Sequence, residues 1–461
     1  MRIVFNTQTP PVRPLPGSRG FPHRDVWRIG VDCLPSVGGV VPMVRAVIRA
    51  STGSWLSPGS GWVSLGGPGY PPRAKLDDGV EARFVNLPEP IRAGYTRFKE
   101  SIWRSFHGTG TFQFDREGYR CFTDYSFRTA RVLQGLADST DAFYIHDFQQ
   151  IQVGGLLGPL APAVLRWHIP FNLEMYPPPV RHFFMANLGG YDGIIVSTRR
   201  ELESLLRAGY RGLAFQIYPH VDPSQYRPAP PGLPGQLREE WDLGDGPVVL
   251  CVARMDPQKR QDLLLEAWPY VARRFPRARL VLVGNGSFSG GHGKASHWRT
   301  YLERLVQRHR ISGSVRFVGY LEDERLAAAY DLSQLVVLPS PREGFGLVAV
   351  EAWLHKRPVL VTEGAGVREI MTRGVDGDVV PAFSSRALAR GMARLLAHPG
   401  QLESMGERGA ETARNCFVDE AIVRIREVFS VVMKGYRQRK RPTRIETGLS
   451  GRYADQVHPE E

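Results

Sequence analysis

One stretch of the chain, residues 336–351 with the sequence VVLPSPREGFGLVAVE, constrains the fold most strongly. The apolar run at residues 335–339 predicts a buried strand, and the Pro/Gly residues after it predict a tight loop. The apolar spacing that follows predicts an amphipathic helix continuing to about residue 356. Similar strand and helix patterns alternate along much of the chain. The sequence therefore predicts doubly wound α/β sheets.

The loop in this stretch combines two glycines with one of two carboxylates. Gly344 and Gly346 remove side chains, so backbone N–H groups can approach an anion at the positive end of the following helix. Glu343 lies in the loop, whereas Glu351 lies two helical turns further on, so the acids are expected to have different roles. The pattern predicts a diphosphate site with Glu343 beside the group that the diphosphate carries. The alternative is a structural unit whose acids are merely solvated.

The order acid, Gly-Phe-Gly, apolar turn, acid resembles the Glu-(x)7-Glu signature of retaining nucleotide-sugar glycosyltransferases with the GT-B fold, of the family 4 type. The resemblance implies two Rossmann-like doubly wound domains that face each other across a cleft. It implies a nucleotide-diphosphate sugar as donor, bound mainly by the second domain, and a carbohydrate acceptor bound by the first. It also implies that no metal ion and no other cofactor is required.

A second cationic loop follows the apolar run at residues 248–252. Arg254 and Lys259 stand at the two ends of this loop, so both cations can point at one diphosphate; the alternative is ordinary surface charge. The spacing resembles the Arg-x-Asp-x-x-Lys pattern of trehalose-6-phosphate synthases. That resemblance implies that both cations hold the diphosphate. The same family resemblance implies that Glu351 binds the ribose hydroxyls and that Glu343 contacts the donor sugar ring. It also implies that backbone amides of the loop help to hold the diphosphate, namely those of Gly344, Phe345, Gly346 and Leu347.

The first half of the chain contains another glycine turn and two histidines at predicted strand ends. Gly38 and Gly39 precede a helical pattern, and the family resemblance implies that this turn closes on the donor phosphate. The segment AFYIHDFQQ predicts a strand that ends at His146, and AVLRWHIPF predicts one that ends near His168. In a parallel sheet, both histidines would lie at the edge where such folds bind ligands. Residues at the two strand ends therefore become candidates, including Asp147 and Arg166.

A narrower resemblance covers residues 146–171. IHDFQQ followed by LRWHIPFNLEMYPPPVRHFF resembles the trehalose-6-phosphate synthases, and Arg-x-His-Ile with the later Tyr191-Asp192 resembles the trehalose glycosyltransferring synthases. This implies glucose transfer to glucose or glucose 6-phosphate. His168 would lie near the reacting sugar, with His146, Asp147 and Arg166 on the acceptor side. Asn172 stands where the first group favours proline, and Pro170 where the second usually has aspartate, so the acceptor stays open.

The length of 461 residues exceeds a single core and predicts two domains. We expect a first, acceptor-binding domain at residues 1–222 and a Pro/Gly-rich linker at 223–246. A nucleotide-sugar-binding domain is expected at 247–418, followed at 419–461 by a helix that crosses back to the first domain and a basic tail. Residues 51–80, rich in Gly, Pro and Ser, are expected to form an irregular insertion. The aromatic residues of the two helical patterns after it, including Trp103, are expected to serve packing.

Composition narrows the function classes further. No run approaches the roughly 20 apolar residues of a membrane span, and the N-terminus lacks the apolar core of a signal peptide, so a cytoplasmic protein is expected. The four cysteines show no metal-ligand spacing and are expected to be reduced. The net charge of +13 could suggest nucleic acid, but no basic run inside the folded part is interleaved with aromatics, and an anionic small substrate explains a basic cleft equally well. The basic tail is expected to be a solvated end, with an anionic membrane surface as the alternative. A homo-oligomer is left open.

Two other functions remain compatible with these motifs. A glycogen-synthase-like polymerising enzyme, or a transferase that acts on lipid, would share every donor motif. A nucleotide-sugar-binding regulator without turnover is the alternative from a different class. Such a regulator would have no evident need for the sugar-facing acid Glu343.

Overall fold

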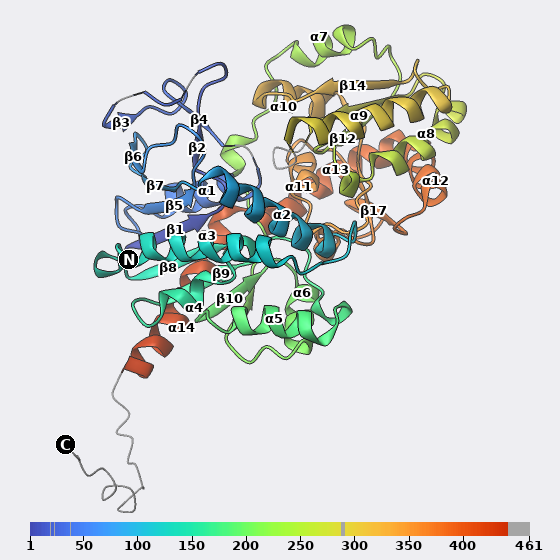
Figure 1. The fold of residues 1–461 in the computed structure, drawn as a ribbon. Coiled ribbons are helices and arrows are strands. Elements are labelled where there is room, and N and C mark those ends of the chain that lie inside the picture. Colours follow the sequence, from blue (N-terminus) through green and yellow to red (C-terminus); the bar gives the residue numbers. More distant parts are fainter. Residues whose placement is uncertain (19, 23, 37, 287–290, 441–461) are drawn as a thin grey trace, which may run out of the picture.

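The computed structural model describes residues 1–461 except 19, 23, 37, 287–290 and 441–461, and it contains two α/β units stacked side by side (Figure 1). The first unit is built around a nine-stranded sheet and the second around a six-stranded sheet. In spatial order the first sheet contains β11 (Ala214–Gln216), β10 (Gly193–Val196), β9 (Ala163–Arg166), β8 (Ala142–His146), β1 (Ile3–Thr7), β5 (Gly61–Leu65), β7 (Glu81–Val85), β6 (Arg73–Leu76) and β3 (Val26–Trp27). The second contains β14 (Val315–Gly319), β13 (Arg279–Val283), β12 (Val248–Val252), β15 (Leu335–Leu338), β16 (Val359–Thr362) and β17 (Gly377–Val380).

Both sheets follow the doubly wound strand order. Counted along the chain from β1 and from β12, six strands of each sheet lie in the order 3-2-1-4-5-6, and neighbours in this set pair in parallel. In such sheets the order reverses beside the first strand, and ligands bind outside the carboxyl ends of the strands at that point. The reversal lies between β1 and β8 in the first sheet and between β12 and β15 in the second. The Rossmann-like architecture predicted from the sequence is confirmed.

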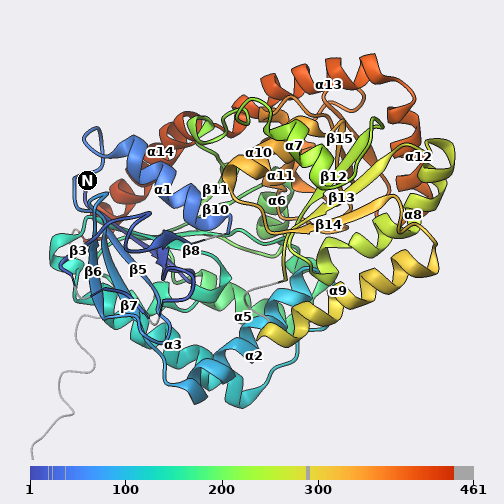
Figure 2. The same ribbon diagram turned by 90° about the horizontal axis from the view of Figure 1, so that it is seen from above.

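Helices cover both faces of each sheet, as alternation of strand side chains requires. In the first unit, one face packs against α2 (Glu89–Phe106), α3 (Arg116–Gln134), α4 (Val153–Leu157), α5 (Pro178–Leu188) and α6 (Arg199–Arg207), and the other against α1 (Val40–Ser51) and α14 (Val418–Lys440). In the second unit, one face packs against α8 (Gln261–Arg274), α9 (Gly291–Arg308), α12 (Ser385–Leu396) and α13 (Pro399–Thr412), and the other against α7 (Leu233–Glu240), α10 (Asp323–Leu332) and α11 (Leu347–Leu354). Figure 2 shows these layers from above.

The last helix, α14, returns from the second unit to the first. Its buried side chains join the same core as those of α1, namely Ala421, Ile425, Val428, Phe429 and Val432. The helix thereby ties the end of the chain to the first sheet (Figure 1). The end of the basic tail, from residue 441 onward, lies outside the described residues.

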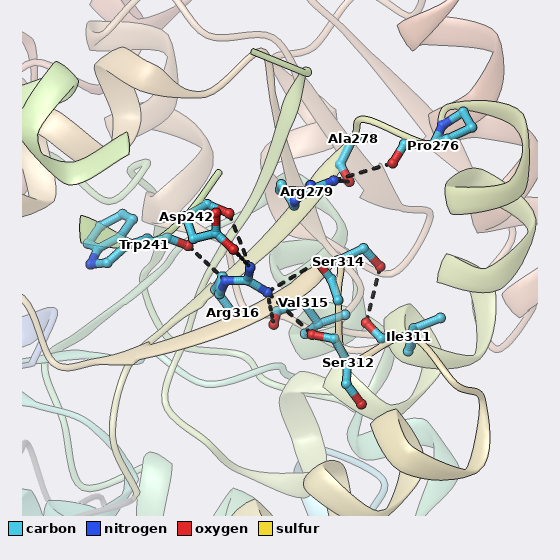
Figure 3. A network of polar contacts seen from close by, with 11 residues as sticks. Trp241, Asp242, Pro276, Ala278, Arg279, Ile311, Ser312, Ser314, Val315 and Arg316 are labelled. Atoms are coloured by element: carbon cyan, nitrogen blue, oxygen red, sulfur yellow. Dashed lines mark hydrogen bonds and ion pairs between the residues drawn. The ribbon is translucent and has the colours of Figure 1, made fainter. Parts of the chain in front are cut away.

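The connection between the units, predicted at residues 223–246, packs against the second unit. It contains α7, whose Leu237 is fully buried in the second unit. Figure 3 shows how Arg316 on β14 fastens the end of this segment: its guanidinium donates to the backbone oxygens of Trp241 (2.7 Å) and Asp242 (3.1 Å) and pairs with the Asp242 carboxylate at 2.7 Å. The connection therefore belongs structurally to the second unit.

The prediction of an irregular insertion at residues 51–80 is wrong. This segment contains β5, which lies between β1 and β7, and β6. Trp62 and Val63 on β5 are fully buried on opposite faces of the sheet. The strand is only five residues long, and the Gly, Pro and Ser residues around it obscure its apolar pattern.

Two further properties bear on the environment of the protein. None of the described helices combines the length and the apolar content of a membrane span. All four cysteines are free; Cys121 is half-buried, and the other three, Cys33, Cys251 and Cys416, are buried.

Candidate active site

An ion pair between two loops marks the centre of the candidate site. β12 and β15 are neighbours in the sheet, so the loops after them meet, and Lys259 Nζ lies 2.5 Å from Glu343 Oε2. The side chains are only 20% and 17% exposed, respectively. Burial by itself raises the pKa of Glu343. The Lys259 ammonium lowers this pKa by more than burial raises it, so the pKa lies below its usual value. Glu343 is therefore ionised at neutral pH and paired with a cation.

The loop that carries Glu343 touches the first unit directly. A Cβ atom on Gly344 would lie 2.6 Å from the backbone oxygen of His168, a distance that real Cβ atoms essentially never show, so only glycine fits without a shift. On its other side the loop hydrogen-bonds the segment after β16: Glu343 N–H donates to Gly364 O, and Gly366 N–H donates to Glu343 O, both at 3.2 Å. The loop is thus held from both units.

The glycine turns of the two units face each other at the N-terminus of α11. Gly346 has φ +103°, a left-handed conformation that favours glycine, and the predicted helix begins at Leu347 and ends at Leu354. A Cβ atom on Gly39, the residue before α1, would lie 3.7 Å from Leu347 Cδ1, which is ordinary contact. Gly38 has φ +123° in the same turn. Phe345 is buried and packs its ring 5.6 Å from that of Tyr218, so only its backbone can serve a ligand.

Two tyrosine hydroxyls hold the second acid of the motif. Tyr330 donates to Glu351 Oε2 at 2.8 Å, and Tyr226 donates to Oε1 at 3.5 Å. Burial raises the pKa of Glu351, and the two hydrogen bonds offset only part of that increase. Because each carboxylate oxygen has further lone pairs, Glu351 can still accept bonds from a ligand. The predicted ribose contact stays a prediction.

The two predicted histidines are brought together. His146 Nδ1 lies 3.0 Å from His168 Nε2, and the rings are nearly parallel. Asp147 has φ +74°, which is strained for a residue with a side chain, and its carboxylate accepts a bond from His168 N–H at 3.3 Å. Burial lowers the pKa of both histidines and raises that of Asp147 to about 6. Both rings are therefore neutral at pH 7.

Arg166 is placed differently from the other predicted residues. Its side chain is buried in the first unit, where Nη2 donates to the backbone oxygens of Ile217 (3.2 Å) and Tyr218 (3.0 Å). Nη1 donates to the Tyr144 hydroxyl at 3.3 Å. These bonds tie β9 to the segment that follows β11. A contact of Arg166 with an acceptor stays a prediction.

Arg254 reveals a part of the site that sequence reasoning missed. Its guanidinium lies over the ring of Trp103 at 5.2 Å, and Trp103 belongs to α2 of the first unit. The expectation that Trp103 only serves packing is therefore incomplete. His107 and Gly108 follow directly after this helix, and His107 interacts electrostatically with Lys259, Glu343 and Arg254. The only signal in the sequence was a His-Gly pair at the end of a helical pattern, which indicates a helix stop rather than a ligand site.

Glu369 was also missed. Its carboxylate, in the second unit, accepts bonds from the first two N–H groups of α6 in the first unit. Among the described residues no group of three or more His, Cys, Asp or Glu side chains has the arrangement of a metal site.

Comparison with known proteins finds a matching family and several curated relatives. The sequence profile of the family described as Glycosyl transferases group 1 matches residues 236–412. The chain is 30% identical over 259 residues to a D-inositol 3-phosphate glycosyltransferase from Streptomyces bingchenggensis, an alignment covering 54% of this chain and 55% of the relative. It is 30% identical over 348 residues to a protein of the same name from Streptomyces griseus, covering 68% and 72%. The chain thus spans between about half and three quarters of the length of these curated relatives.

A solved structure shares the whole architecture. The alpha,alpha-trehalose 6-phosphate synthase from Burkholderia multivorans superimposes with a TM-score of 0.77 over 96% of this chain and 99% of its own, at 19% identity. This likeness shows the GT-B fold. The Streptomyces griseus relative, together with the family profile, shows that the chain belongs to the group 1 glycosyl transferases.

Proposed function

We propose that the protein transfers a hexosyl group, with retention of the anomeric configuration, from a nucleotide-diphosphate sugar to a small carbohydrate or sugar-phosphate acceptor. The observation that carries this proposal is the Lys259–Glu343 pair beside the N-terminus of α11, where glycine turns of both units meet. A cation, backbone amides and a fixed carboxylate in one place suit a diphosphate leaving a sugar.

Each residue of the site has a defined role in this proposal. As the bond between the sugar C1 and the diphosphate oxygen breaks, negative charge builds on the diphosphate, and Arg254 and Lys259 stabilise it. Backbone N–H groups of residues 344–347 add to this stabilisation. Glu343 accepts a hydrogen bond from a hydroxyl of the donor sugar, and Glu351 accepts bonds from the ribose. Because the cations come from side chains, we expect activity to persist in the presence of a metal chelator.

Retention follows when the acceptor attacks the face from which the diphosphate leaves. The acceptor oxygen forms a bond to C1, and its proton passes to an oxygen of the departing diphosphate. No nucleophilic carboxylate about 5 Å from a second acid is needed, in contrast to retaining glycosidases. The neutral His146–His168 pair then orients the reacting sugar through hydrogen bonds rather than through charge.

Glucose and glucose 6-phosphate are the first acceptor candidates. The motifs at residues 146–171 resemble those of trehalose-forming enzymes, which supports a trehalose-type product. An inositol phosphate is the second candidate, because the relatives reported above are named D-inositol 3-phosphate glycosyltransferase. Both candidates are small polyols that can carry a phosphate.

The test is release of nucleoside diphosphate from a panel of nucleotide-diphosphate hexoses. Each donor is offered with glucose, glucose 6-phosphate, inositol 3-phosphate, a glucan, phosphatidylinositol vesicles or no acceptor, with and without EDTA. Release that depends on one of the small acceptors supports the proposal and identifies the acceptor. Release only with the glucan or the vesicles favours a polymerising or lipid-directed transferase. Binding of the nucleotide without turnover for any acceptor favours a regulator.

A further inference from the structure

The end of α2 reaches from the first unit to the cationic loop of the second. Trp103 lies in its last turn and contacts the Arg254 guanidinium at 5.2 Å. A Cβ atom on Gly108, two residues after the helix, would lie 2.7 Å from Arg342 Nη1, so this backbone also touches the residue that precedes Glu343. Two independent contacts therefore place the helix end against the loops that follow β12 and β15.

The geometry of His107 defines which of its nitrogens can bind a ligand. His107 Nδ1 lies 2.8 Å from the backbone oxygen of Trp103. A carbonyl oxygen only accepts hydrogen bonds, so Nδ1 must carry the proton. In the neutral ring Nε2 is then an acceptor. The imidazole also packs against the Trp103 ring, with centroids 4.5 Å apart, which fixes its orientation.

The surroundings keep the ring neutral. His107 is only 9% exposed, and burial is the main reason that its pKa falls to about 4. Its bond to Trp103 and the carboxylate of Glu343 favour the charged form, whereas Lys259 and Arg254 oppose it. A neutral ring with an acceptor nitrogen is thus held within electrostatic range of the Lys259–Glu343 pair.

We propose that the end of α2 forms a further wall of the donor site and that His107 Nε2 accepts a hydrogen bond from one hydroxyl of the donor sugar. This inference rests on the proposed function and adds a determinant of donor specificity to it. Glu343 and His107 come from different units, so in this proposal the donor sugar contacts one hydrogen-bond acceptor from each unit. A donor sugar without a hydroxyl in that position loses this bond.

The test uses two histidine replacements that differ in the atom they keep. In His107→Asn the amide N–H can still donate to Trp103 O, but no acceptor remains at the position of Nε2. In His107→Gln the longer side chain places an amide oxygen near that position. His182→Asn, at an exposed site on α5, is the matched control. Calorimetry then measures the dissociation constants of each nucleotide-diphosphate sugar and of each nucleoside diphosphate alone.

We expect His107→Asn to weaken binding of the sugar donor about three- to tenfold and to leave nucleoside diphosphate binding unchanged. His107→Gln should recover part of the loss. One deoxy-sugar donor should bind wild type and His107→Asn equally, because the bond is already missing. Equal loss for donor and nucleoside diphosphate, or no loss at all, would overturn the inference while the proposed function stands. Failure of the wild-type protein to bind any of these nucleotides would overturn both.

Discussion

Lys259 Nζ and Glu343 Oε2 lie 2.5 Å apart, although 84 residues of sequence separate them. The pair joins the loop after β12 to the loop after β15, at the point where the strand order of the second sheet reverses. In the proposed reaction Lys259 binds the diphosphate and Glu343 binds the sugar. One ion pair thus spans the bond that is to be broken.

Replacing Lys259 by methionine should destabilise the protein, because it leaves the largely buried Glu343 carboxylate without its cation. We expect a loss of about 1–3 kcal/mol in the free energy of unfolding at pH 7, less than for fully buried pairs. Burial alone raises the pKa of Glu343, so the loss should shrink as the pH falls and the carboxyl becomes protonated. Chemical denaturation at several pH values measures this.

The matched control for that variant is Lys356→Met. Lys356 pairs with Glu407 at 3.1 Å, but both side chains are more than half exposed. Exposed ion pairs contribute little to stability, so the free energy of unfolding should fall by less than about 1 kcal/mol. This loss should not change with the protonation of the Glu343 carboxyl. Equal losses for both variants would contradict the assignment of Glu343 as a buried, paired acid.

Tyr330→Phe should weaken nucleotide binding without abolishing the fold. The change removes only the hydroxyl that donates to Glu351 Oε2, and it keeps the ring that stacks on His355. If Glu351 binds the ribose, we expect the dissociation constant for the nucleoside diphosphate to rise about three- to tenfold. Tyr226→Phe, whose bond is 3.5 Å long, should have a smaller effect. An unchanged dissociation constant in Tyr330→Phe would argue against a ribose contact that depends on this hydroxyl.

Glu369→Ala should loosen the contact between the two units. The carboxylate accepts bonds from Arg199 N–H (2.8 Å) and Arg200 N–H (2.9 Å), the first residues of α6, where the helix dipole favours negative charge. We expect a larger radius of gyration in small-angle X-ray scattering and weaker donor binding. Glu363→Ala, at an exposed position of the same unit, is the control. An unchanged radius of gyration in Glu369→Ala would show that this cap does not hold the units together.

His107 should make the stability of the protein fall in mild acid. Its pKa is about 4 in the folded protein, against about 6.5 in the unfolded chain, so between these values only the unfolded chain binds the proton. The stability contributed by the neutral ring is present above pH 6.5 and is lost as the pH falls towards 4. Relative to His107→Asn, wild type should lose roughly 3 kcal/mol over this range. Parallel pH profiles of unfolding free energy for the two proteins would contradict a neutral, buried His107.

The sequence was sufficient to predict the parts of the site that lie next to strand ends. Apolar runs followed by glycine or cationic loops predicted β12, β15 and α11. Because β12 and β15 are neighbours in the sheet, the loops after them bring Lys259 and Glu343 together. His146 and His168 were predicted to lie at one sheet edge by the same reasoning, and they do. These predictions succeed because a parallel sheet places all its carboxyl strand ends on one side.

The remaining parts could not be predicted because they depend on how the two units pack. Trp103 and His107 reach the loops after β12 and β15 only because α2 projects across the junction, and the pattern of a helix end carries no information about this. Glu369 caps a helix that lies 169 residues earlier in the chain. β5 was missed for a different reason, since its flanking glycines and prolines outweighed the three apolar side chains of this five-residue strand in the local composition.

The most direct test of the account is the stereochemistry and rate of sugar transfer by wild type and Glu343→Gln. With the donor and acceptor identified by the panel, NMR of the product reports the configuration at the new anomeric centre. We predict that an α-linked donor gives an α-linked product. Glu343→Gln should reduce kcat by about 10²–10³-fold while it still binds the nucleoside diphosphate. A product of inverted configuration would contradict the proposed retention. A Glu343→Gln variant with wild-type kcat would contradict the central claim that this acid and Lys259 hold the two sides of the reacting bond.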